Sequence, residues 1–238
     1  MLLPRYLLRE DTVLRAVGRG GSRRIADIGC GGAEILIPLA RRGHRGVGYD
    51  PSPVARDSAR GRLEQSGQKG FRIVAEWPEG ELFDVVLLLE VIGYPEDPVA
   101  LLSRCRALLA PGGELLVSFV PPEAGYDPRV TRNMRHFAAG EMRELLRQAG
   151  FADVQIVNYG YPLANSTVGL MNLVNGFLVR QAERRGERVE TGLMHRATWL
   201  APLGLICNRL TIKPFCALQR LFARTGLGNG FVARARVS

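Results

Sequence analysis

The sequence is poor in the residues that bind metals and form covalent cross-links. It has four cysteines and three histidines, and no two cysteines show the Cys-x-x-Cys spacing of zinc and redox sites. We therefore expect no structural metal and no disulfides. The chain also lacks an apolar run long enough to cross a bilayer. Charge interrupts its N-terminal apolar stretch too early for a secretory signal, so we expect a cytoplasmic protein.

Acidic residues are scarce in the last third of the chain. Residues 159–238 hold eleven basic residues against three acidic ones, so this part carries nearly all of the net charge of +9. Such an excess suits nucleic acid, an anionic membrane surface or an acidic substrate. It is also typical of a solvated face in an arginine-rich proteome. The charge pattern leaves these alternatives open.

The most informative stretch that is present runs from Arg23 to Asp50. An apolar strand expected at 24–28 enters a glycine turn, a helix follows over about 34–42, and a second strand at 45–49 ends on an acid. This order is typical of a nucleotide-binding βαβ unit. Glycine allows the sharp turn and lets a ligand lie against bare main chain. The carboxylate that ends the second strand suits a ribose diol, because it can accept two hydroxyl protons.

The residues around the glycine turn indicate the kind of nucleotide. Asp50 follows Gly29 at about the spacing expected for a ribose-binding acid. A dinucleotide fingerprint needs glycine where Glu34 stands, and a carboxylate at that position repels pyrophosphate. Asp27, just before the turn, suits a cationic amine instead. The pattern therefore predicts a nucleoside ligand that carries an amine and no phosphate.

The segment resembles the first motif of class I S-adenosylmethionine (SAM)-dependent methyltransferases, commonly Asp/Glu-x-Gly-x-Gly-x-Gly, with Ala33 in place of the last glycine. Other features match this family in chain order. They are an apolar run at 83–92 typical of a central parallel strand, a Leu-x-Pro-Gly-Gly turn at 109–113, and Gly150-Phe151 before the sixth strand. The resemblance covers about residues 24–158. It implies SAM as methyl donor and S-adenosylhomocysteine (SAH) as product.

The resemblance also assigns residues to the cofactor. The turn and the acid after the second strand would hold the amino-acid and ribose parts of the cofactor. Residues after the third strand would hold the adenine. The end of the fourth strand would face both cofactor and acceptor. A helix ahead of the first strand would fold over the cofactor and bring Arg5 and Tyr6 to it. Plain packing of this helix, and a surface acid beside a half-buried Trp after the third strand, are the alternatives. The cofactor-binding residues so predicted are Asp27, Gly29, Cys30, Gly31, Asp50, Pro51, Glu76, Trp77, Glu90 and Tyr6.

Catalytic residues are harder to predict, because the sulfonium of SAM already activates the leaving group and the protein mainly aligns donor and acceptor. A base is needed only if the acceptor must lose a proton. The acceptor should lie beyond the C-terminal ends of strands four to six, near Tyr94, Tyr126, His136, Tyr161 and Asn165. Of these, His136, Tyr94 and Tyr161 are the catalytic candidates. His136 is the preferred base because its pKa class suits neutrality, although a histidine there can also cap a helix or fill space.

We expect an α/β fold with a Rossmann-like, seven-stranded, mostly parallel sheet and helices on both faces, as the resemblance implies. The expected organisation is an N-terminal helical lid at 1–23, a SAM-binding core at 24–159, a helical insertion or cap at 160–229 and a final antiparallel strand at 230–238. Further helices are expected at 2–18, 51–66, 97–109 and 137–148, and further strands at 71–75, 83–92, 114–120 and 152–159.

The insertion is the part that the family fold does not explain. Its second apolar stretch, 199–222, interleaves basic residues with leucine and isoleucine. Such a stretch suits an anionic membrane surface, a cap over an apolar pocket, a subunit interface, or plain packing against the domain. Pro202 and Pro214 argue against one continuous helix.

The sequence therefore predicts a SAM-dependent methyltransferase acting on a small or medium, partly apolar acceptor, such as a specialised metabolite or a lipid-linked intermediate. A nucleic-acid methyltransferase is the first alternative. It is weakened because Glu90-Val91-Ile92-Gly93 stands where an Asn/Asp-Pro-Pro-Tyr/Phe run would follow the fourth strand. A protein that binds SAM without methylating is the second. The expected partners are the small substrate, an anionic membrane at its periphery, and a second copy through the insertion.

Overall fold

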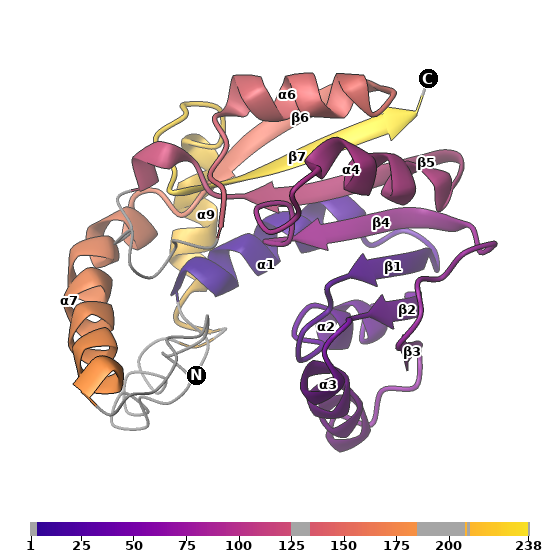
Figure 1. The fold of residues 1–238 in the computed structure, drawn as a ribbon, viewed down its shortest axis with the longest axis horizontal. Coiled ribbons are helices and arrows are strands. Elements are labelled where there is room, and N and C mark those ends of the chain that lie inside the picture. Colours follow the sequence, from indigo (N-terminus) through magenta and orange to yellow (C-terminus); the bar gives the residue numbers. More distant parts are fainter. Residues whose placement is uncertain (1–3, 125–133, 185–207, 209, 238) are drawn as a thin grey trace.

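The core of the molecule is a seven-stranded sheet with strand order β3-β2-β1-β4-β5-β7-β6 (Figure 1). The computed structural model describes residues 4–124, 134–184, 208 and 210–237. Every pairing is parallel except those of β7, which runs antiparallel to both β5 and β6. The predicted α/β fold class is confirmed. The strands are β1 (Arg24–Ile28), β2 (Arg45–Tyr49), β3 (Phe71–Val74), β4 (Phe83–Leu89), β5 (Leu109–Phe119), β6 (Phe151–Tyr159) and β7 (Gly230–Val237).

Helices cover both faces of this sheet, and each face has its own apolar cluster. One cluster joins residues of α1, α2 and α3 to the sheet, and the other joins residues of α4 and α6 to the opposite face. Because β4 is buried on both faces, its side chains divide between the two clusters. The described helices are α1 (Pro4–Val17), α2 (Leu36–Ala40), α3 (Pro53–Gln65), α4 (Pro98–Ala107), α6 (Ala139–Gln148), α7 (Leu163–Arg184), α9 (Lys213–Leu221) and the short 3-10 helix η1 (Pro122–Ala124).

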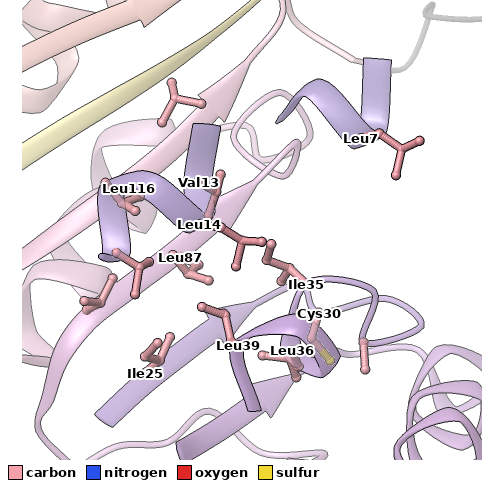
Figure 2. Packing of buried hydrophobic residues seen from close by; sticks show 14 of the residues in the cluster. Leu7, Val13, Leu14, Ile25, Cys30, Ile35, Leu36, Leu39, Leu87 and Leu116 are labelled. Atoms are coloured by element: carbon pink, nitrogen blue, oxygen red, sulfur yellow. The ribbon is translucent and has the colours of Figure 1, made fainter. Parts of the chain in front are cut away.

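Helix α1 is packed into the first of these clusters. Figure 2 shows Val13 and Leu14 of α1 close to Leu87 and Leu116 of the sheet. Burial of such a side chain contributes about 1.5–3 kcal/mol. The N-terminal helix is thus held by apolar contacts along its length, and its first turn lies near the C-terminal ends of the strands.

Several element boundaries differ from the sequence prediction for local reasons. Strand β5 begins at Leu109 and not at 114, since Leu109 pairs with Phe83 before a register shift brings Glu114 opposite Val85. The Pro-Gly-Gly turn is therefore an irregularity within the strand. Helix α2 is shorter than the predicted 34–42. It begins late, at Leu36, because the turn extends through Ala33, which has a positive φ of 60°.

The insertion between β6 and β7 contains α7 and α9, as the helical pattern predicted. Helix α9 has proline in its first turn, at Pro214, where a missing backbone N–H costs nothing. Pro202 lies outside the described residues. Among the helices that the structure describes, none combines the length and apolar character needed to cross a membrane.

Candidate functional site

The glycine turn after β1 is closed by the neighbouring strand. The N–H groups of Gly29 and Cys30 both donate to the Tyr49 carbonyl, at 2.7 and 2.9 Å. Gly29 has a φ of 78°, and a Cβ there would overlap the side chain of Val91. Only glycine fits this position without strain. The turn therefore lies against the start of the segment after β4, at the point where the strand order reverses and α/β proteins bind ligands.

Asp50 follows β2 and turns its carboxylate toward the same turn. One oxygen accepts the N–H of Gly31 at 2.9 Å and the other accepts the N–H of Ser52 at 2.9 Å. The side chain is largely buried, with the residue only 9% exposed. Each carboxylate oxygen has a further lone pair. The two backbone bonds thus fix an acceptor group that can still receive the hydroxyls of a diol.

Asp27, near the end of β1, is a buried carboxylate with an unsatisfied oxygen. Its residue is 2% exposed, and Oδ1 has no hydrogen-bond partner within the described part of the chain. Burial raises the pKa of Asp27 to about 7, against the opposing effect of the Arg9 charge. A buried acceptor without a partner is costly. The position therefore fits a ligand that supplies a cationic donor.

Glu90, directly after β4, is held by α1 and β6. Arg5 donates to both of its carboxylate oxygens at 2.9 and 2.8 Å, and Tyr159 donates its hydroxyl at 2.8 Å. A nitrogen of Arg9 lies 3.4 Å away. Burial alone would raise the pKa of Glu90, but the charges of Arg5 and then Arg9 hold it at about 2. Glu90 also has a positive φ of 63°, which a non-glycine residue adopts only when its surroundings fix it.

Arg9 and Tyr159 were not among the residues predicted from the sequence. The only sequence signal for Arg9 is its spacing of four residues from Arg5, which places both guanidinium groups on one face of a helix. Tyr159 ends the sixth strand, where the alternation of side chains does not reveal a charged partner. The Glu90 carboxylate, which was predicted to face the cofactor, is engaged by these three residues.

His136 lies near the same cluster. Burial and then the charge of Arg5 lower the pKa of its imidazole, while Glu90 acts in the opposite direction. Its Nε2 atom is buried and has no hydrogen-bond partner in the described structure. At neutral pH the ring is therefore neutral and able to accept a proton.

The other predicted residues are distributed around this end of the sheet. Trp77 contacts Tyr49 edge-on at 5.3 Å between ring centroids and lies under Arg104, while Glu76 beside it is exposed. Glu76 and Trp77 both line an open hollow of about 430 Å³ after β3. Pro51 is exposed.

Two further predicted residues lie close to the turn and α1. Cys30 is buried, and this burial raises the pKa of its thiol. Tyr6 stacks with Arg9, whose guanidinium carbon lies 5.1 Å from the ring centroid. Cys105 and Cys216 are free and buried like Cys30.

Of the residues predicted to border the acceptor, one is exposed after β4 and two contact the insertion. Tyr94 follows β4 and is 49% exposed. Tyr161 packs edge-on against Phe222 at 4.9 Å, and Asn165 donates to the Leu227 carbonyl at 2.8 Å, so these two residues contact the second half of the insertion. Tyr126 and Cys207 lie outside the described residues. Within the described ranges, no group of three or more His, Cys, Asp or Glu side chains is arranged to hold a metal ion.

Comparison with known sequences places the chain in a recognised group. A family model described as a methyltransferase domain matches residues 4–156, well over half of the chain. The ubiquinone biosynthesis O-methyltransferase of Cereibacter sphaeroides is 35% identical over 150 residues, which are 55% of this chain and 61% of that protein. The chain thus spans about three fifths of that relative's length.

Solved structures share the fold at lower identity. A SAM-dependent methyltransferase of Thermotoga maritima, described as a possible histamine N-methyltransferase, superposes with a TM-score of 0.57 at 19% identity, covering 95% of this chain and 86% of that one. The N-methyltransferase NodS of Bradyrhizobium japonicum, solved with SAH, gives a TM-score of 0.54 at 23% identity over 66% of this chain and 80% of that one. At these identities the likeness is one of fold.

Proposed function

Because the chain belongs to the class I SAM-dependent methyltransferases, we propose that it transfers a methyl group from SAM to an oxygen atom of a small or medium, partly apolar acceptor. The half-buried, neutral imidazole of His136, whose buried Nε2 has no hydrogen-bond partner in the described structure, is the observation that carries this proposal. Transfer to oxygen is supported by the O-methyltransferase name of the relative from Cereibacter sphaeroides. Specialised metabolites and lipid-linked intermediates are the acceptor classes that fit an apolar insertion.

The residues at the C-terminal ends of β1 and β2 fit SAM. The unsatisfied oxygen of Asp27 suits the cationic amine of its amino-acid part, and the fixed carboxylate of Asp50 suits the ribose diol. The glycine turn allows the nucleoside to lie against main chain, and the hollow beside Glu76 and Trp77 suits the adenine. When bound, SAM supplies a methyl group already activated by the sulfonium.

His136 and the α1 cluster have separate tasks in this proposal. His136 accepts the proton of the acceptor hydroxyl at Nε2, so that the oxygen is nucleophilic when it is aligned with the methyl group. Burial and the charge of Arg5 lower the pKa of the imidazole and keep it neutral. The bonds of Arg5 and Arg9 to Glu90 hold the start of α1 beside the site. Tyr94 and Tyr161 border the acceptor and orient it. Incubation with labelled SAM and a panel of phenols, carboxylates and amines tests the proposal, and failure to release SAH with any of them would favour a protein that binds SAM without methylating.

Replacement of His136 by glutamine should lower kcat about 100-fold for the phenolic acceptor that gives the highest turnover, because removal of a general base typically costs this much. Affinity for SAH, measured by calorimetry, should stay within about twofold because the imidazole does not contact the donor. The wild-type acid limb of kcat should lie below the ordinary histidine pKa and should be absent in the variant. His44→Gln, at the other end of the sheet, is the control. Unchanged kcat in His136→Gln would show that no base is used there.

Binding of SAH should depend on pH through Asp27. The pKa of Asp27 is about 7 in the free protein, and a bound ammonium lowers it because the opposite charge favours the carboxylate. Affinity should therefore be constant above pH 7 and fall as the pH drops below it, to about 30-fold weaker at pH 5.5 than at pH 8. Calorimetry at the two pH values measures this.

The matched variants separate Asp27 from other groups. Asp27→Asn should bind more weakly at pH 8 and lose the pH dependence, whereas Asp153→Asn, on an exposed part of β6, should behave as wild type. A wild-type affinity that does not change between the two pH values would remove Asp27 from the amine site.

The location and partners are proposed with this activity. A cytoplasmic enzyme that touches an anionic membrane at its periphery, or that pairs with a second copy through residues 160–229, would explain why this apolar part of the chain is rich in arginine. We also propose the division of the chain into a lid at 1–23, a SAM-binding core at 24–159, an insertion or cap at 160–229 and a final strand at 230–238.

A further inference from the structure

Large apolar side chains are exposed over α9 and its flanks. Of the ten large apolar residues that are exposed in the described structure, five lie between residues 210 and 227, on α9 and its flanks, and two more lie on α7. Leu221 is 78% exposed and Leu210 is 70% exposed, values normal for charged residues. Such a concentration in one part of a chain indicates a contact surface, whereas single exposed apolar residues need no explanation.

Helix α9 buries a polar side chain and exposes an apolar stripe, which is the reverse of a usual surface helix. Its inner face buries Cys216 and Gln219. The Gln219 amide donates to the Leu8 carbonyl at 3.1 Å and accepts the N–H of Gly160 at 3.0 Å, so polar bonds fix the helix to α1 and to the end of β6. The residues spaced by three at 215, 218 and 221, which are Phe, Leu and Leu, are all exposed. A surface helix normally turns this stripe inward.

The charge along the chain around this stripe has one sign, and the acid that meets it in space is Asp11 of α1, which is paired with Arg220 at 3.3 Å. After Glu190 the sequence contains no acidic residue, and every charged side chain is basic. Lys213, which begins α9, and Arg224, three residues beyond its end, are exposed. Apolar side chains bordered by cations match the boundary between headgroups and acyl chains of an anionic bilayer. A second copy docked on the same face by a two-fold axis would bring like charges together, which disfavours that occupant.

The stripe lies beside the acceptor end of the site. In Figure 1, α9 is at the end of the sheet toward which β4 and β5 point, next to α1. Phe222, directly after α9, packs on Tyr161, and Leu227 accepts a hydrogen bond from Asn165. Tyr161 and Asn165 are the residues expected to border the acceptor.

We propose that Phe215, Leu218 and Leu221, together with Lys213 and Arg224, form a docking face for an anionic membrane. The apolar side chains enter the boundary below the headgroups, the two cations meet lipid phosphates, and the site beside Tyr161 then opens toward the bilayer. This inference rests on the proposed function, since it assigns to that enzyme an acceptor that reaches the site from the membrane.

Sedimentation with vesicles tests the docking face. At low salt the full chain should sediment with phosphatidylcholine vesicles that contain phosphatidylglycerol and should bind pure phosphatidylcholine much more weakly, with binding falling as salt is added. The double variant Leu218→Ser/Leu221→Ser should bind at least about tenfold more weakly, because it removes apolar area from the contact. Val54→Ser/Leu82→Ser, which changes exposed apolar residues elsewhere, is the matched control and should bind as wild type.

A second pair of variants separates charge from apolar contact. Lys213→Gln/Arg224→Gln should reduce binding to anionic vesicles and flatten its salt dependence, with little effect on neutral ones. Absence of sedimentation with anionic vesicles at low salt would overturn the proposal. A change of oligomeric state in Leu218→Ser/Leu221→Ser, measured by light scattering, with vesicle binding unchanged would assign the face to a second copy instead.

The outcome can be separated from that of the proposed function. Calorimetry with SAH and turnover of a soluble phenolic acceptor should be unchanged in all of these variants. If the wild type binds SAH and turns over the acceptor but does not bind anionic vesicles, the docking face is wrong and the methyltransferase proposal stands. If vesicles are bound but no acceptor is methylated, the methyltransferase proposal fails and the surface stands.

Discussion

Replacement of Glu90 by alanine should lower the free energy of unfolding by about 3–5 kcal/mol, because it leaves Arg5 and Arg9 without their shared carboxylate. It also removes the acceptor of the buried Tyr159 hydroxyl. Breaking one side of a largely buried ion pair costs far more than the pair contributes, since the remaining charges stay desolvated. Urea unfolding followed by circular dichroism measures this change.

The matched control is Glu79→Ala. Glu79 lies 3.5 Å from Arg104, but their side chains are 79% and 54% exposed. Water screens this pair, so its loss should cost less than about 1 kcal/mol. If the two variants were equally stable, the cluster at the end of β4 would not hold α1 to the sheet.

The stabilisation that Glu90 gives to the folded protein should also decrease at low pH. Its pKa is about 2 in the folded protein, below the ordinary value of 4.5. The stabilisation is therefore fully present above about pH 4.5 and is lost as the pH falls toward 2. The difference in unfolding free energy between wild type and Glu90→Ala should shrink over that range. A difference that stays constant from pH 6 to pH 3 would show that the contribution of Glu90 is not electrostatic.

The sheet was predictable because its signals are local. Apolar runs between helical patterns indicate where the strands lie, and the family resemblance supplies their number. The glycine turn with Asp50 gives the ligand end of β1 and β2 without tertiary information. The start of β5 was missed because Pro111-Gly112-Gly113 is typical of a turn, whereas pairing of Leu109 with Phe83 across the sheet decides the strand. Long-range pairing overrode local preference at that point.

The partners of Glu90 could not be predicted for a related reason. Arg5 and Tyr159 are 85 and 69 residues away from Glu90, and only the packing of α1 on the sheet brings them together. Periodicity indicates that Arg5 and Arg9 share a helix face but not what that face meets. The same limit applies to α9, where the spacing of Phe215, Leu218 and Leu221 gives an apolar face, and the bonds of Gln219 decide that this face points outward.

Replacement of Asp50 by alanine should weaken SAH binding by at least about 100-fold. The carboxylate is held in place by the N–H groups of Gly31 and Ser52. In the proposed complex it also accepts both ribose hydroxyls, and a hydrogen bond to a charged group contributes about 1.5–3 kcal/mol. Calorimetry measures the loss. Asp57→Ala, which removes a largely exposed acid in α3, is the matched control and should bind SAH as wild type does.

Weaker binding by Asp50→Ala alone would not prove contact with the ribose, because the variant also releases the backbone of the glycine turn. The 2′-deoxy analogue of SAH separates the two effects in a thermodynamic cycle. Wild type should prefer SAH to the analogue by about tenfold or more, since the analogue lacks one of the two hydroxyls. Asp50→Ala should bind both ligands equally, because the group that distinguishes them is gone. If the variant kept the full wild-type preference, Asp50 would serve only to shape the turn, and the ribose would have to be held by another residue at the ends of β1 and β2.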